Sequence, residues 1–186
     1  MKKMLLAAVF VTFAGGAGAA ELAGVSLPDT VEVAGQELVL NGIGLREKAW
    51  IDVYVGGLYV PEASDKAADL IEANGPSRMV MHFVRDVPVD KVVEAWNDGF
   101  KNNNSKELNE AIAERAEQFN AFFTEDLAKD DVITIDYIPD EGTKVFVNSD
   151  LKGTIPGHDF ATAVRAIWLG PKPPTKKFQQ GLLGKR

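Results

Sequence analysis

The stretch that decides the fold is GIGLREKAWIDVYVGGLYV, residues 42–60. Polar and aromatic side chains at positions 50, 52 and 54 alternate with Ile and Val at 51, 53 and 55, the period of two that is typical of a β-strand. A tight turn around residues 47–49 would join this strand to a preceding one that carries Arg46. Gly56-Gly57 predicts a bulge or bend in the second strand.

Arg46 and Tyr54 are the two residues in this stretch that the strand pattern alone does not explain. A buried arginine is costly unless an anion meets it. On two strands joined by a tight turn, the guanidinium fork and the tyrosine hydroxyl can approach each other and hold a carboxylate at the head of an apolar cleft. The alternative is a structural arginine that pairs with Asp52 or Glu47. The residues alone leave both interpretations open.

The rest of the chain predicts one α+β domain with a largely antiparallel sheet. A hairpin turns at Ala34-Gly35, and a strand with two apolar faces follows at 77–87, which favours a central place in the sheet. A short helix at 63–75 is expected to be capped by Ser64. The remaining expected elements are helices at 88–103 and 105–127, strands within 130–157, a helix at 158–169 and a short C-terminal helix.

Several large apolar side chains recur at helical spacing and have two possible roles. Either they pack in the core, or they line a cleft that takes an apolar ligand. The candidates for lining are Trp96, Phe100, Phe119, Phe123 and Trp168.

The signatures of common catalytic and metal sites are missing. The sequence holds no Cys, which excludes disulfides and thiolate chemistry, and its two His do not have metal-ligand spacing. His82 is expected on a sheet face or in the core, and His158 is expected to cap the last long helix. We therefore predict no catalytic residue, no metal site and no cofactor.

Residues 1–20 have the pattern of a signal peptide, which makes 21–186 the mature domain. Lys2 and Lys3 precede an apolar run, and Ala17-Gly18-Ala19 predicts cleavage after Ala19 or Ala20. An N-terminal anchor is the alternative, although the run is shorter than a membrane span requires. We expect an exported, periplasmic protein. Loss of the two lysines takes the formal net charge from −7 to −9. The sequence also contains no basic tract, which argues against nucleic acid and anionic lipid surfaces as partners.

The stretch 42–60, together with VFVNSDLKGTIPGHDFATAVRAIWLG at 145–170, resembles the chalcone isomerase-like superfamily, and within it the bacterial exported branch. The motifs that carry the resemblance are Gly-x-Gly-x-Arg-x-Lys at 42–48, Val-Tyr-x-x-Gly-Leu-Tyr at 53–59, Arg-Asp-Val at 85–87 and Ile-Trp-Leu-Gly at 167–170. The resemblance implies an open-faced β-sandwich, in which a layer of helices covers one side of a large antiparallel sheet and a ligand cleft lies between them.

The resemblance also implies a function. In this superfamily, fatty-acid-binding members hold the carboxylate with an Arg and a Tyr at the places of Arg46 and Tyr54. True isomerases have a Thr in place of that Tyr and add a Tyr and an Asn from the helical layer, where this chain places Pro88 and Ala95. We therefore expect a binder of a fatty acid or similar apolar carboxylate. The alternatives are an intramolecular lyase that closes a phenolic enone and a non-catalytic envelope protein with an empty cleft; the oligomeric state stays open.

Overall fold

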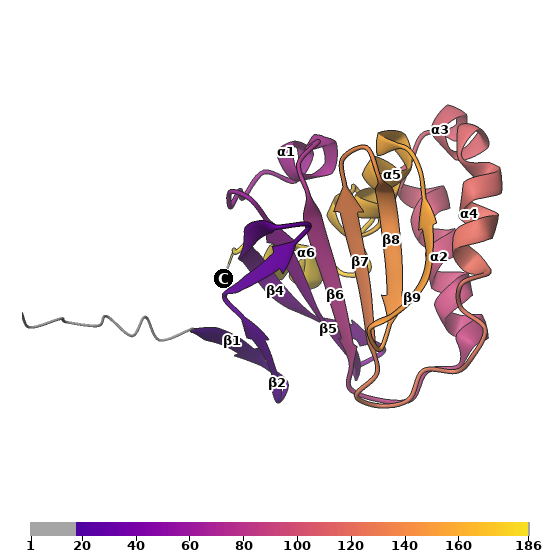
Figure 1. The fold of residues 1–186 in the computed structure, drawn as a ribbon. Coiled ribbons are helices and arrows are strands. Elements are labelled where there is room, and N and C mark those ends of the chain that lie inside the picture. The colour runs from indigo at the N-terminus through magenta and orange to yellow at the C-terminus, as the bar shows by residue number, and fades with distance from the viewer. Residues whose placement is uncertain (1–17, 186) are drawn as a thin grey trace, which may run out of the picture.

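An antiparallel sheet of seven strands forms the centre of the computed structural model, which describes residues 18–185 (Figure 1). The strands lie side by side in their sequence order, so each is joined to its neighbour as in a meander. β6 is the central strand, as its two apolar faces predict. The strands of this sheet are β3 Thr30–Val33, β4 Gln36–Lys48, β5 Ile51–Val60, β6 Ser77–Phe83, β7 Val132–Ile138, β8 Gly142–Val147 and β9 Asp150–Ile155.

Helices cover one face of this sheet, which confirms the α+β class and the one-sided helical layer (Figure 1). The last long helix begins and ends at the predicted residues. The single helix expected over 105–127 is wrong, because it is interrupted at Ile112 and ends at Asn120. Ser105 caps its first part by accepting the Leu108 N–H at 3.1 Å. The helices are α1 Ala67–Glu72, α2 Val89–Asn103, α3 Lys106–Ala111, α4 Ala113–Asn120, α5 His158–Leu169 and α6 Lys176–Leu182.

The β4–β5 hairpin turns at Ala49-Trp50, where both residues have positive φ values of 50° and 65°. The bulge predicted at Gly56-Gly57 is wrong, because both glycines pair regularly with β4. The register instead shifts at Val53, which has no partner between the pairs Arg46–Tyr54 and Glu47–Asp52. A bulge bends the strand and redirects side chains, and here it does so beside the two candidate site residues.

Gly56 is needed for packing rather than for a bend. A Cβ at Gly56 would lie 2.5 Å from the Phe178 ring of α6, and a Cβ at Gly44 on the neighbouring strand would lie 2.8 Å from the Phe178 carbonyl oxygen. The two glycines form a smooth patch on which α6 lies. Phe178 is fully buried there, so α6 closes the sheet at this end.

The core lies mainly between the sheet and the helices, where apolar side chains of β5 to β9 meet those of α2, α4 and α5. A separate hairpin, β1 Ala19–Leu22 and β2 Val25–Pro28, adds to the other face of the sheet. Its Val25 and Leu27 pack with Val55 in a smaller cluster. The sheet is therefore partly covered on its second face as well.

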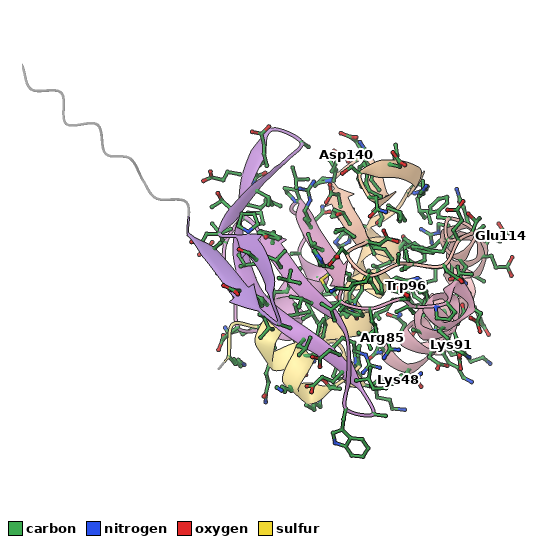
Figure 2. The ribbon with its side chains drawn as sticks, turned by 90° about the horizontal axis from the view of Figure 1, so that it is seen from below. Lys48, Arg85, Lys91, Trp96, Glu114 and Asp140 are labelled. Atoms are coloured by element: carbon green, nitrogen blue, oxygen red, sulfur yellow. The ribbon has the colours of Figure 1, made fainter. Side chains whose placement is uncertain are left out.

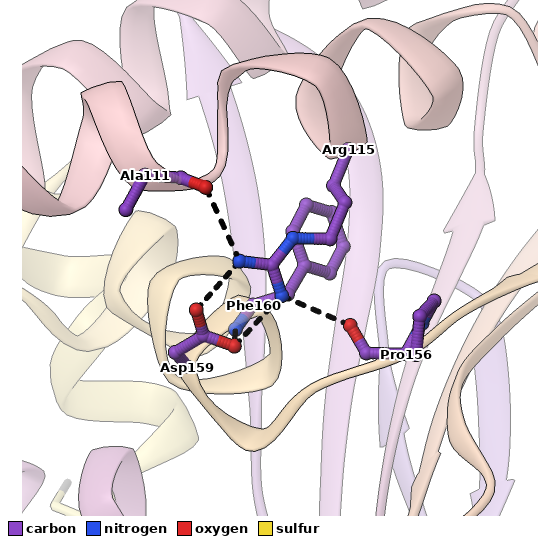
Figure 3. A network of polar contacts seen from close by, with 5 residues as sticks. All are labelled: Ala111, Arg115, Pro156, Asp159 and Phe160. Atoms are coloured by element: carbon purple, nitrogen blue, oxygen red, sulfur yellow. Dashed lines mark hydrogen bonds and ion pairs between the residues drawn. The ribbon is translucent and has the colours of Figure 1, made fainter.

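A network around Arg115 ties α4 to the beginning of α5 (Figure 3). The guanidinium donates to both carboxylate oxygens of Asp159, at 2.7 and 2.6 Å, and to the Pro156 carbonyl oxygen at 3.0 Å. This hydrogen bonding holds the pKa of Asp159 below its usual value. Bidentate pairing fixes orientation as well as distance, so the network sets the angle at which α5 enters the helical layer.

Two predicted caps are wrong. The N-cap of α1 is Lys66 rather than Ser64. The Ser64 hydroxyl accepts the Lys66 N–H at 3.1 Å, and this N–H lies before the first residue of the helix. The N-cap of α5 is Gly157, and His158 instead places Nε2 3.1 Å from the Ala73 carbonyl oxygen. The Ser64 and His158 side chains therefore contact the backbone at the two ends of α1, at Lys66 and Ala73.

The predicted leader, 1–20, lies almost wholly outside the described residues, and cleavage after Ala19 or Ala20 stays a prediction. Ala19 and Ala20 begin β1 and pair with Pro28 and Leu27. Within residues 18–185, no helix is both long enough and apolar enough to span a bilayer.

Candidate functional site

A cavity of about 390 Å³ lies between the sheet and the helices α2 and α5. Strands β4, β5 and β6 form its floor, α2 and the end of α5 form one wall, and the segment between α5 and α6 forms another. Ligand cavities in proteins commonly measure 300–1,000 Å³, so this one has the size of a small-molecule site. Its lining includes Arg46, Lys48, Val53, Tyr54, Met81, Phe83, Trp96, Ile167 and Trp168, with further residues of α2 and of 172–174.

Arg46 and Tyr54 both line this cavity and are directly opposite each other on β4 and β5. The sequence predicts that the two residues approach each other, but the turn lies at Ala49-Trp50 rather than at 47–49, and the bulge at Val53 sets the register that pairs them. The bulge at Val53 explains why two consecutive residues of β5, Val53 and Tyr54, both face the cavity, since regular strands alternate their side chains.

No ion pair joins Arg46 to a carboxylate anywhere in residues 18–185, so the structural pairing with Asp52 or Glu47 is not formed. Arg46 Nη1 donates only to the backbone carbonyl oxygen of Glu47. The Glu47 carboxylate pairs with Lys177 at 3.1 Å instead. The half-buried guanidinium therefore keeps most of its five N–H donors for another acceptor in the cavity.

The Tyr54 hydroxyl is held by Trp168, whose indole Nε1–H donates to it at 3.1 Å. Burial raises the pKa of Tyr54 to about 12, an effect that the Trp168 hydrogen bond and the nearby Arg46 charge only partly offset. The phenol is therefore protonated at neutral pH. Because Trp168 occupies an acceptor position, and no acceptor for the Tyr54 O–H occurs among the described residues, that proton is available to a ligand.

The predicted aromatic lining divides into two groups. Trp96 and Trp168 line the cavity and pack edge to face with ring centroids 5.7 Å apart. Phe100, Phe119 and Phe123 do not line it. The rings of Phe119 and Phe123 lie 5.3 and 5.6 Å from that of Trp96, and all three Phe belong to the core behind it.

Helix α2 contributes a polar stripe to the cavity that the sequence analysis missed. Lys91, Ala95, Asp98 and Asn102 recur every three or four residues, which places them on one face of a helix beside the buried stripe of Trp96. The spacing was visible in the sequence, but polar residues beside an apolar stripe are usually solvated. Ala95, which the resemblance predicts at the place of the isomerase amide, lies in the lining and presents only a methyl group to the cavity. Pro88 lies at the N-cap of α2, outside the lining.

A short segment between α5 and α6, residues 172–174, forms the outer wall of the cavity. Asn103 at the end of α2 fixes it: the side-chain amide donates to the Lys172 carbonyl oxygen at 3.0 Å, and its oxygen accepts the Lys172 N–H at 2.8 Å. Pro173 and Pro174 then restrict the backbone. The only signal for this wall in the sequence is the Pro173-Pro174 pair, which is equally typical of a linker.

The comparisons with known proteins agree with this architecture. A model of the family described as chalcone isomerase-like matches residues 19–184. The chain belongs to the chalcone isomerase-like family. The resemblance noted in the sequence is thus confirmed for the superfamily, while the bacterial exported branch stays a prediction. No curated protein sequence matches this chalcone isomerase-like chain.

Among solved structures, the chalcone isomerase-like chain is similar to a fatty-acid-binding protein of Arabidopsis thaliana, with a TM-score of 0.72 and 18% identity. The match covers 89% of this chain and 96% of the plant protein. At this identity the likeness establishes the fold, including the open-faced sandwich, and leaves the ligand to be argued from the cavity itself.

Proposed function

We propose that this chalcone isomerase-like protein binds a fatty acid or a similar apolar carboxylate in the cavity between sheet and helices. The observation that carries the proposal is the pair at the floor of the cavity: within the part of the chain that the structure describes, Arg46 has no carboxylate partner and the Tyr54 hydroxyl opposite it has no acceptor for its proton. A carboxylate accepts hydrogen bonds from both donors and neutralises the arginine. The similarity to a plant fatty-acid-binding protein supports this choice of ligand.

The apolar part of the ligand would lie against Val53, Phe83, Trp96 and Trp168. Each buried methylene contributes about 0.8 kcal/mol, so affinity should rise with chain length until the cavity is filled. We further propose that the protein works outside the cytoplasm, with residues 1–20 as its leader, on the strength of the signal-peptide pattern.

The experiment that tests this function compares a fatty acid with the fatty alcohol of the same chain length, by calorimetric titration of delipidated protein. The two ligands bury the same apolar chain and differ only at the head. We expect the acid to bind more tightly, and we expect this preference to vanish in Arg46→Ala. Equal affinities of the wild-type protein for the acid and the alcohol would show that Arg46 and Tyr54 do not recognise a carboxylate.

A further inference from the structure

The tip of the β4–β5 hairpin carries an apolar surface that the binding function does not explain. Trp50 is 95% exposed and its neighbour Ile51 is 47% exposed. Trp50 also occupies a turn position with a φ of 65°, where Gly or Asn would be the unstrained choice. A large aromatic side chain placed in water on a projecting turn gains nothing from packing in the isolated chain.

Cationic side chains surround this tip and the neighbouring end of the cavity. Lys48, which directly precedes the turn, is exposed and also lines the cavity. Figure 2 shows Lys48, Arg85 and Lys91 at the same end of the molecule. Within residues 18–185, neither Lys48 nor Arg85 forms an ion pair, whereas Lys91 is paired with Asp90 and Glu94.

Acidic groups lie at this end as well. Asp52 is exposed beside the tip, and Asp86 uses one carboxylate oxygen to accept the Lys129 N–H at 2.8 Å. Glu47 is paired with Lys177. Lys48 and Arg85 are thus the two cations at this end that form no ion pair within residues 18–185, and Asp52 and Asp86 carry an equal number of negative charges.

We propose that this tip is a membrane-contact surface: Trp50 and Ile51 enter the interfacial layer of a bilayer that contains anionic lipid, while Lys48 and Arg85 meet lipid phosphates. Tryptophan is enriched at the membrane–water interface, and each basic residue near an anionic leaflet adds to the attraction. Two side chains on a projecting turn offer far less than the ~800 Å² per partner of a stable protein interface. The chemistry therefore favours a lipid surface over a second protein.

The tip lies next to the cavity, which relates the membrane contact to ligand binding. Because Lys48 belongs to both surfaces, docking the tip would hold the cavity close to the bilayer, from which an apolar carboxylate can enter. This purpose rests on the proposed function, but the contact itself does not require a bound ligand. The sequence argues against lipid surfaces because it contains no basic tract. The fold nevertheless brings Lys48 and Arg85, from separate segments, to the same end of the molecule.

Intrinsic fluorescence tests the proposal, because the chain has three Trp and the other two, Trp96 and Trp168, are only 5% and 2% exposed. Delipidated protein is mixed with vesicles of phosphatidylcholine alone, or with an equal part of phosphatidylglycerol. We expect a blue shift and co-sedimentation with the anionic vesicles that weaken with added salt. Trp50→Ser should bind about tenfold more weakly, since it loses one large apolar side chain.

The matched control is Leu151→Ser, which removes another exposed apolar side chain, 54% exposed, from the far edge strand β9. It should bind vesicles as wild type does. Absence of vesicle binding, or equal losses in both variants, would overturn the proposal, as would a concentration-dependent dimer of wild type that Trp50→Ser abolishes. Arg46→Ala keeps the tip and should still bind vesicles, so failure of fatty-acid binding and failure of membrane contact are separate results.

Discussion

Replacement of Arg46 by alanine should leave the stability of the empty protein almost unchanged and should weaken the stabilisation of the loaded protein by its ligand. In the empty protein, Arg46 makes one hydrogen bond, to the Glu47 carbonyl oxygen, and no ion pair among the described residues. Its removal forfeits about 0.5–1.5 kcal/mol for that bond and relieves the desolvation of a half-buried cation. We expect the free energy of unfolding of delipidated Arg46→Ala to lie within about 1 kcal/mol of wild type.

In the loaded protein the same change removes a charge-assisted contact with the carboxylate, worth about 1.5–3 kcal/mol. At about 1.4 kcal/mol per factor of ten, fatty-acid affinity should fall about 10- to 150-fold. With ligand at about 100 times its wild-type dissociation constant, binding stabilises wild type by about 2.7 kcal/mol. For a chain of this length that raises the melting temperature by about 5–11 °C. At the same ligand concentration, about half to nine-tenths of this shift should vanish in Arg46→Ala.

The assay is a set of four thermal melts, wild type and variant, each delipidated and with a saturating fatty acid. Arg46→Lys is the matched control, because it keeps the charge but lacks the planar fork, and it should recover only part of the shift. If delipidated Arg46→Ala melts far below wild type while keeping the full ligand-induced shift, Arg46 is structural and our reasoning about the site is refuted.

Four further outcomes follow from the geometry. Trp168→Phe should weaken fatty-acid binding about 2- to 10-fold by releasing the Tyr54 hydroxyl, and a titration equal to wild type would contradict its positioning role. Asn103→Ala, which loses both bonds to Lys172, should speed ligand release in stopped-flow measurements, with an unchanged rate as the contrary result. The free energy of unfolding, measured by denaturant melts, should fall between about pH 10 and pH 12. In the folded state the pKa values of Tyr54 and Tyr59 are raised from 10.0 to about 12, so in this range the folded protein binds more protons than the unfolded chain. A free energy of unfolding that does not change with pH in this range would contradict the prediction. Chalcone should cyclise at its spontaneous rate, and a faster rate lost in the Arg46→Ala variant would favour an enzyme.

The parts of the fold that were predicted correctly depend on local rules. Helix α5 was placed from its apolar period alone, because nothing in 158–169 competes with helix formation. The approach of Arg46 to Tyr54 was predicted from a hairpin with a short turn. The turn lies at Ala49-Trp50 rather than at 47–49, and the bulge at Val53, which the sequence analysis missed, sets the register that makes the two residues partners.

The incorrect or missing parts depend on contacts between distant segments. The glycines at 56 and 57 looked like a bulge, but Gly56 is small because Phe178 of α6 lies on it. Trp168 was expected only to line the cavity, and its hydrogen bond to Tyr54 joins residues that are 114 positions apart. No pattern within one segment contains that information.

The same distant contacts explain where the cavity ends. Gly44 and Gly56 let the Phe178 ring fill the space between sheet and α6, and this ring packs edge-on against Tyr54 with centroids 5.5 Å apart. On that side of Tyr54 the interior is packed solid; on the other side it opens into the cavity. Phe178 on one side and Trp168 on the other therefore leave the Tyr54 hydroxyl at the boundary, next to Arg46, which pairs with no carboxylate of residues 18–185. A ligand with one anionic end and a long apolar body matches such a boundary, because Arg46 and Tyr54 can bind its charged end and the apolar lining of the cavity can contact its chain.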